Sequence, residues 1–168
     1  KAVPEIIREN GGEPVRTRVG HSFIKAKMAE TNAVFGGEHS AHYYFRDFWR
    51  ADSGMLAAMH VLAALGQQDK PLSEMMAKYN RYAASGEINS RLDSAEAQAD
   101  RTEAVVKAFA DRAENVDRLD GVTVELKDGN WFNVRASNTE PLLRLNVEAD
   151  TQEAVDALVK EILAIIRA

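Results

Sequence analysis

A glycine-opened loop carries the side chains in this sequence that are best suited to chemistry. Residues 36–42 read Gly-Gly-Glu-His-Ser-Ala-His, which places a carboxylate, a hydroxyl and two imidazoles on one short segment. Glu38 could accept hydrogen bonds from two vicinal hydroxyl groups, and Ser40 could donate or accept one. The segment would suit a polyol ligand, although composition alone favours the simpler interpretation of a polar turn with an N-capping serine.

A second donor-rich segment, residues 135–141, reads Arg-Ala-Ser-Asn-Thr-Glu-Pro and joins two predicted strands. Arg135 could bind a phosphate through two parallel hydrogen bonds. Ser137, Asn138 and Thr139 would add hydroxyl, amide and backbone N–H donors. An ordinary connection rich in turn-forming residues explains the spacing equally well.

A third segment, Val-Gly-His-Ser at residues 19–22, stands where a helix is predicted to begin. The free backbone N–H groups and the helix dipole would favour an anion there, with His21 beside it. The simpler interpretation is that Ser22 caps the helix.

A metal site is the remaining alternative for the histidines. His39 and His42 lie three positions apart, with Glu38 and His21 as further candidate ligands. Zinc needs three or four ligands in a defined geometry. Neighbouring residues of an extended loop point to opposite sides, so the pattern does not favour a metal.

The elements that position these loops differ between the two halves of the chain. In the first half, helical and extended signals alternate, which predicts an α/β layer with a mixed sheet. The apolar run 33–35, stopped by two glycines, predicts a buried strand. Ser22 is a predicted N-cap, and Asp52 and Ser53 precede a further predicted helix. Helices are expected over residues 4–9, 22–30, 54–66 and 72–79, and a β-permissive segment over 14–19.

The second half changes character near residues 83–86, where we place a domain boundary. Its predicted order is β-α-β-β-β-α, an antiparallel sheet with helices on one face, which is an α+β module. Asp128-Gly129-Asn130 is a strong hairpin signal between two alternating segments. Strands are expected over 87–92, 122–126, 132–136 and 143–147, and helices over 100–114, with Asp100 and Glu103 as an acidic capping box, and 150–165.

Composition narrows the classes of function. The chain has 168 residues, 28% of them charged, and a net charge of −5 with dispersed Lys and Arg, which argues against nucleic-acid binding. The absence of cysteine excludes disulfides and thiolate metal sites. No apolar run reaches the ~18 residues that span a bilayer and no signal peptide is evident, so we expect no membrane contact and a cytoplasmic location. The chain starts at Lys1 without a methionine, directly before the predicted helix 4–9, which suggests a cut end.

Taken together, the three segments resemble the α-D-phosphohexomutase superfamily, of the phosphomannomutase/phosphoglucomutase type. Residues 37–42 resemble its sugar-specificity loop, G-E-x-S-[GA]-H, and residues 135–141 resemble its phosphate-binding loop, R-x-S-N-T-x-P. Gly20-His21-Ser22 with Lys25 is similar to the segment that precedes the sugar loop, and the order along the chain agrees.

The resemblance implies a partial domain 3 over residues 1–82 and a TATA-box-binding-protein-like domain 4 over residues 83–168. It implies a substrate site with His42 as the candidate general acid or base, and a separate phosphate site. The implied substrate-binding residues are His21, Glu38, Ser40 and His42, and the implied phosphate-binding residues are Arg135, Ser137, Asn138 and Thr139.

Two family motifs are absent: the serine loop T-A-S-H-N-P and the magnesium loop D-G-D-G-D-R. The resemblance therefore implies a C-terminal portion, inactive alone, of an enzyme that uses Mg²⁺ and a hexose 1,6-bisphosphate intermediate. Its expected partners are mannose or glucose phosphates and the N-terminal domains of the same protein. The sugar loop does not choose between mannose and glucose. The alternative is a free-standing, non-catalytic sugar-phosphate-binding module.

Overall fold

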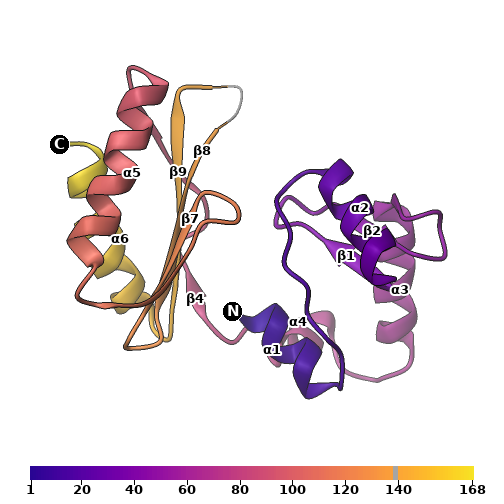
Figure 1. Ribbon diagram of the computed structural model, residues 1–168. Helices are drawn as coiled ribbons and strands as arrows, with labels where there is room; N and C mark the ends of the chain where they lie inside the picture. Colours follow the sequence, from indigo (N-terminus) through magenta and orange to yellow (C-terminus); the bar gives the residue numbers. More distant parts are fainter. Residues whose placement is uncertain (138–139) are drawn as a thin grey trace. The chain divides into compact units, whose positions relative to one another are not determined.

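The computed structural model describes residues 1–137 and 140–168, which form two compact units (Figure 1). One unit is Gly12–Tyr79. The other joins Lys1–Gly11 to Asn80–Ala168, so its first helix is separated in sequence from the rest of it. The domain division between residues 82 and 83 stays a prediction. Within the described ranges, no helix is long and apolar enough to cross a membrane.

The Gly12–Tyr79 unit combines helices with a three-stranded sheet of order β1-β2-β3. The elements are α2 (His21–Thr31), β1 (Phe35–Gly37), β2 (Tyr43–Phe45), β3 (Ala51–Asp52), α3 (Gly54–Gly66) and α4 (Leu72–Ala77). Both strand pairs are antiparallel, whereas we expected a mixed sheet. Short loops join the three strands directly, and parallel pairing would require a long crossover connection.

The core of this unit is small. Ile24 and Met28 of α2 pack with Tyr44 of β2, and each of the three is at most 3% exposed. The expected buried strand at residues 33–35 is wrong, because β1 begins at Phe35, which is 50% exposed. Residues 14–19 form no strand.

Helix α3 begins as predicted, since Ser53 accepts a hydrogen bond from the backbone N–H of Leu56 at 3.1 Å. Its apolar stripe, however, is not covered. No residue of α3 is buried, and Met55, Met59 and Leu62 are between 57% and 77% exposed. The sequence pattern is typical of a helix face that packs against another element, but no part of the described chain packs against this face.

The second unit is built on an antiparallel sheet of order β4-β9-β8-β7-β6, with β5 also pairing β9. Its elements are α1 (Ala2–Glu9), β4 (Ala83–Ala84), β5 (Ile88–Arg91), α5 (Ala95–Phe109), β6 (Ala113–Asp117), β7 (Val122–Leu126), β8 (Trp131–Ala136), β9 (Leu142–Ala149) and α6 (Gln152–Ile166). Helices α5 and α6 lie on one face of the sheet (Figure 1). The predicted fold class, α/β followed by α+β, is confirmed.

Alternation explains how this sheet meets its helices. Along β9 every second residue is buried, from Leu143 to Ala149, while the residues between remain partly exposed. The buried residues pack against Val105 and Phe109 of α5 and the inner face of α6. The predicted hairpin is confirmed: the N–H of Leu126 donates to the carbonyl of Asn130 at 2.8 Å. The polar face of β8 and β9, including Arg135, is thereby left on the side away from the helices.

The bounds of both helices that pack on this sheet differ from the expectation. Helix α5 begins at Ala95, because Ser94 caps it by accepting from the N–H of Ala97, and not at Asp100. It ends at Phe109, and residues 113–117 are the strand β6, which pairs with β7. Helix α6 begins after the cap Thr151. Its last buried residue is Ile166, whereas Ile165 is only partly buried.

Helix α1 is tied to the second unit by polar side chains. The hydroxyl of Tyr82 donates to Glu5 at 2.7 Å, and Arg81 donates to Glu9 at 2.6 Å. The hydrogen bond to Glu5, together with burial, raises the pKa of Tyr82 to about 12. The bond to Glu9 likewise raises the pKa of Arg81, so the guanidinium stays charged.

Candidate functional site

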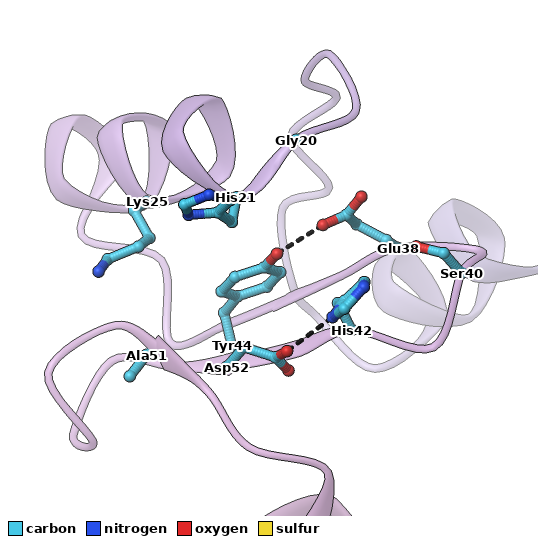
Figure 2. A pocket seen from close by; sticks show the side chains of 9 residues that line it. All are labelled: Gly20, His21, Lys25, Glu38, Ser40, His42, Tyr44, Ala51 and Asp52. Atoms are coloured by element: carbon cyan, nitrogen blue, oxygen red, sulfur yellow. Dashed lines mark hydrogen bonds and ion pairs between the residues drawn. The ribbon is translucent and has the colours of Figure 1, made fainter. Parts of the chain in front are cut away.

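A hollow of about 440 Å³ in the Gly12–Tyr79 unit collects the polar groups of the first loop (Figure 2). It is lined by residues from α2, the loop after β1, and strands β2 and β3: Gly20, His21, Lys25, Glu38, Ser40, His42, Tyr44, Ala51 and Asp52. The hollow therefore contains all four residues that the resemblance implied for substrate binding.

The turn between β1 and β2 sets the spacing of the loop. The N–H of Glu38 donates to the carbonyl of His42 at 3.0 Å, and the N–H of Ala41 donates to the backbone carbonyl of Glu38 at 3.1 Å. Ala41 takes a left-handed conformation, with φ of 65°. These bonds close a tight turn on Glu38 and His42, and Figure 2 shows both side chains directed into the same hollow.

Glu38 is anchored from the strand beneath it. The hydroxyl of Tyr44 donates to Oε1 of Glu38 at 2.5 Å, and Tyr44 itself is only 1% exposed. Burial, and then the hydrogen bond to Glu38, raise the pKa of Tyr44 well above its usual value. The phenol therefore stays neutral and donating, so one carboxylate oxygen is fixed while the other can accept from a ligand hydroxyl.

His42 is held in the same way by a second carboxylate. Its Nδ1 lies 2.6 Å from Oδ2 of Asp52, an interaction that raises the pKa of His42. The same hydrogen bond, with a further one from the N–H of Tyr43, lowers the pKa of Asp52. An ionised Asp52 facing His42 is thus the favoured state of the pair.

The helix start adds cationic and imidazole groups. His21 is the first residue of α2, and Lys25 follows one turn later, so both project over the hollow (Figure 2). The predicted capping by Ser22 is wrong. Gly20 is the N-cap, no side chain caps the helix, and the carbonyl of Gly20 accepts from the N–H of Phe23 at 3.0 Å.

The second loop belongs to the other unit. Arg135 is the second-last residue of β8, and its Nε lies 3.9 Å from Oδ2 of Asp120. The N–H of Ser137 donates to the carbonyl of Leu142 at 2.8 Å, which begins the return into β9. Asn138 and Thr139 lie outside the described residues.

Sequence reasoning gave Arg144 no role, although its position is notable. Its Cα is paired with that of Arg135 across β8 and β9, which puts both guanidinium groups on the polar face of the sheet. Arg144 reaches Glu87 at 3.4 Å, while its buried Nε has no hydrogen-bond partner within the described residues. Like charges directly opposite one another are destabilising unless something neutralises them. The polar alternation of residues 144–148 was the signal that could have identified Arg144.

In the hollow itself, three side chains were given no role in the sequence analysis: Lys25, Tyr44 and Asp52. Across the described ranges there is no group of three or more His, Asp or Glu residues placed to hold a metal ion. The residues of the metal alternative, His39, His42, Glu38 and His21, are thus not gathered into such a group. The resemblance places the magnesium of the intact enzyme on the loop D-G-D-G-D-R, which does not occur in this sequence.

Comparison with known proteins identifies the family. Residues 1–82 match the domain family described as phosphoglucomutase/phosphomannomutase, alpha/beta/alpha domain III. Residues 87–165 match the phosphoglucomutase/phosphomannomutase C-terminal domain. The chain therefore belongs to the phosphoglucomutase/phosphomannomutase family, the α-D-phosphohexomutases, and corresponds to its C-terminal part.

Individual relatives agree with this assignment. A phosphomannomutase of Methanocaldococcus jannaschii is 42% identical over 166 residues, which cover 99% of this chain and 36% of the relative. A phosphomannomutase of Escherichia coli is 40% identical over 166 residues, covering 97% and 35%. A solved structure of a family protein from Burkholderia thailandensis matches with a TM-score of 0.78 at 28% identity, covering 98% of this chain and 35% of that one. The chain spans about a third of the length of these relatives.

Proposed function

We propose that this chain supplies the sugar and phosphate recognition of a phosphomannomutase/phosphoglucomutase. The intact enzyme would interconvert hexose 6-phosphate and hexose 1-phosphate through a hexose 1,6-bisphosphate. The observation that carries the proposal is the paired anchoring of Glu38 by Tyr44 and of His42 by Asp52 within one hollow. A polar turn without a ligand would not need its carboxylate and imidazole fixed to face the same space.

In this proposal the free oxygen of Glu38 accepts a hydrogen bond from a sugar hydroxyl, and the hydroxyl of Ser40 donates one to a sugar hydroxyl or accepts one from it. His21 and Lys25 lie beside them, where their donors would meet an oxygen-rich ligand. His42 takes a proton from the attacking sugar hydroxyl, or returns it, since an imidazole titrates near neutral pH. Positioning of this kind is the main contribution that a protein makes to phosphoryl transfer.

The phosphate that does not react would bind in the second unit. Arg135, Ser137, Asn138 and Thr139 supply the donors, and Arg144 adds a second guanidinium opposite Arg135. A bound phosphate would neutralise the facing arginines. Magnesium and the phosphoserine donor belong to the remainder of the intact enzyme, so no step described here passes through a metal.

The test is an amide NMR titration of this chain with mannose 1-phosphate and with glucose 1,6-bisphosphate. Saturable shifts at residues 38–42 and around Arg135 are expected at millimolar ligand, which corresponds to ~4 kcal/mol of binding free energy. Glu38→Gln should abolish the first set of shifts. Its matched control is Glu30→Gln, on the exposed surface of α2, where the carboxylate pairs only with Lys27 among the described residues.

For the phosphate site, Arg135→Gln should remove the second set of shifts, while Arg118→Gln should leave it unchanged. Arg118 pairs with Glu103 on the surface of the same unit. In the intact enzyme, unchanged kcat/KM for both sugars in Glu38→Ala would refute the sugar-contact role. A chain that binds phosphosugars, within a full-length protein that shows no mutase activity, would favour the non-catalytic binding module instead.

A further inference from the structure

Asp52 is more tightly placed than its exposed position suggests. Its Oδ2 contacts Nδ1 of His42 at 2.6 Å, and its Oδ1 accepts from the N–H of Tyr43 at 2.8 Å. The next residue, Ser53, donates its N–H to the carbonyl of Tyr43 at 2.9 Å. Both carboxylate oxygens are thus engaged, and the backbone on which the side chain stands is fixed by the β2–β3 pairing.

This contact determines which nitrogen of His42 carries the proton. An ionised carboxylate can only accept hydrogen bonds, so Nδ1 must be the protonated nitrogen. Nε2 is then left with its lone pair in the neutral ring and becomes a donor in the cation. A histidine is commonly fixed in this way by the group that its other nitrogen contacts. Asp52 therefore leaves Nε2 as the nitrogen that can exchange a proton with a ligand.

We propose that Asp52 is the positioning residue of the reaction: it fixes His42 in the Nδ1–H tautomer so that Nε2 exchanges the proton of the reacting sugar hydroxyl. This inference rests on the proposed function and deepens it. As the hydroxyl oxygen forms its bond to the phosphorus of the phosphoserine donor, the serine oxygen leaves with the electrons of the broken O–P bond and takes a proton from solvent, while the hydroxyl proton passes to Nε2. His42 becomes a cation that Asp52 stabilises while remaining ionised, and the reverse transfer returns the proton.

The surroundings of His42 support a basic imidazole. Besides Asp52, the groups that face the hollow are the carboxylate of Glu38, the neutral phenol of Tyr44, and the side chains of His21 and Lys25 on α2. Asp52 acts first through its hydrogen bond and then through its charge, and Glu38 adds a weaker attraction; all raise the pKa of His42, while burial opposes them. Lys25 and His21, when charged, would act in the opposite direction.

The pair is not buried, which bears on its role. The side chain of His42 is 53% exposed and that of Asp52 is 37% exposed. An exposed ion pair contributes little to stability because solvent screens it. Removing Asp52 should therefore change the protonation of His42 much more than it changes the fold, and this makes the positioning role separable from a structural one.

The decisive experiment on this chain is ¹⁵N NMR of the His42 ring across a pH titration. The expected result is the Nδ1–H tautomer in the wild type, and in Asp52→Asn a shift towards the Nε2–H tautomer together with a lower pKa. Asp47→Asn is the matched control, because Asp47 is 86% exposed, pairs with the neighbouring Arg46 and does not line the hollow. It should change neither property. A wild-type ring without the Nδ1–H preference, or an Asp52→Asn ring identical to it, would overturn the proposal.

Kinetics of the full-length enzyme give the second readout. Asp52→Asn should lower kcat by roughly 10²-fold, within the range of general acid–base catalysis, with KM little changed. The pH–rate limb of His42 should move to lower pH, and Asp52→Glu should recover part of the rate. If Asp52→Asn does not fold, Asp52→Glu alone is used in both the NMR and the kinetic measurement. An Asp52→Glu enzyme with the tautomer, pH profile and kcat of the wild type would refute the requirement for the position of the Asp52 carboxylate.

The two hypotheses fail differently. A wild-type full-length protein without mutase activity would refute the proposed function, and with it the catalytic role of the pair, while the NMR result on the ring would stand. An active enzyme in which Asp52→Asn keeps its kcat and its pH profile would refute the positioning role and leave the proposed function intact.

Discussion

Gly121 gives the sharpest test of how the sheet presents Arg135. The residue lies just before β7 in a left-handed conformation, with φ of 65°. A Cβ atom at this position would stand 2.5 Å from the carbonyl oxygen of Val134 and 2.8 Å from the Cα of Arg135. These are backbone contacts, so Gly121→Ala must push β8 away from the turn at the point where the second loop begins.

The magnitude can be separated into two parts with a matched glycine. Gly86 has nearly the same φ, 66°, but a Cβ there would meet nothing within 4 Å. Gly86→Ala should therefore lower the free energy of unfolding only by the left-handed penalty of roughly 1–2 kcal/mol. Gly121→Ala adds the displacement of packed backbone, which typically costs about 1–3 kcal/mol. We expect a total loss of roughly 2–5 kcal/mol for Gly121→Ala.

Urea unfolding followed by tryptophan fluorescence measures this difference. Trp131 lies on β8 in the same unit as both glycines, and a Trp49→Phe background removes the signal of the Gly12–Tyr79 unit. The amide resonance of Arg135 should shift in Gly121→Ala and remain in place in Gly86→Ala. Equal free energies of unfolding for the two variants would refute the argument, since they would mean that the close approach of the turn to β8 carries no cost.

Two further predictions concern tyrosines that donate to carboxylates. Tyr44→Phe should weaken binding of sugar phosphates by releasing Glu38, and it should cost only about 1 kcal/mol of stability because that carboxylate can hydrate; unchanged affinity by NMR titration would contradict the anchoring of Glu38. The pKa of Tyr82 is raised to about 12, so its stabilising contribution is complete below the unfolded-state value of about 10 and is lost as the pH rises towards 12. As the pH rises between these values, the free energy of unfolding measured with urea should fall more steeply for the wild type than for Tyr82→Phe. Equal decreases in both proteins would contradict this prediction.

Elements with strong local signals could be predicted from sequence. The alternation along residues 143–147, the hairpin at Asp128-Gly129-Asn130 and the helix that follows Ser53 are each confirmed by a burial pattern or a hydrogen bond. Strand β6 could not be predicted in this way. Its three central residues are all exposed, so no period of two is visible, and its place is set by pairing with β7. The helix expected over residues 100–114 overlaps only the first two residues of β6, and no element was expected over the other three.

Some residues of the candidate site could be predicted from the sequence, but their arrangement in space could not. Glu38, Ser40 and His42 could be identified because they share one loop. Tyr44 and Asp52 could not, because in the sequence one is an aromatic residue in an apolar strand and the other precedes a helix. Only the antiparallel pairing of β2 with β3 brings the Asp52 carboxylate to His42.

The geometry of the hollow depends on one row of residues across the small sheet. Tyr44 is paired with Gly36 on one side and with Asp52 on the other, so the three positions share a face. A Cβ at Gly36 would lie 3.0 Å from both Ile24 and Met28, which means that the missing side chain allows α2 to approach the sheet closely. This approach brings the start of α2, with its donors, over the anchored Glu38 and His42. The absence of a side chain at one position is therefore as much a part of the site as the groups that would touch a ligand.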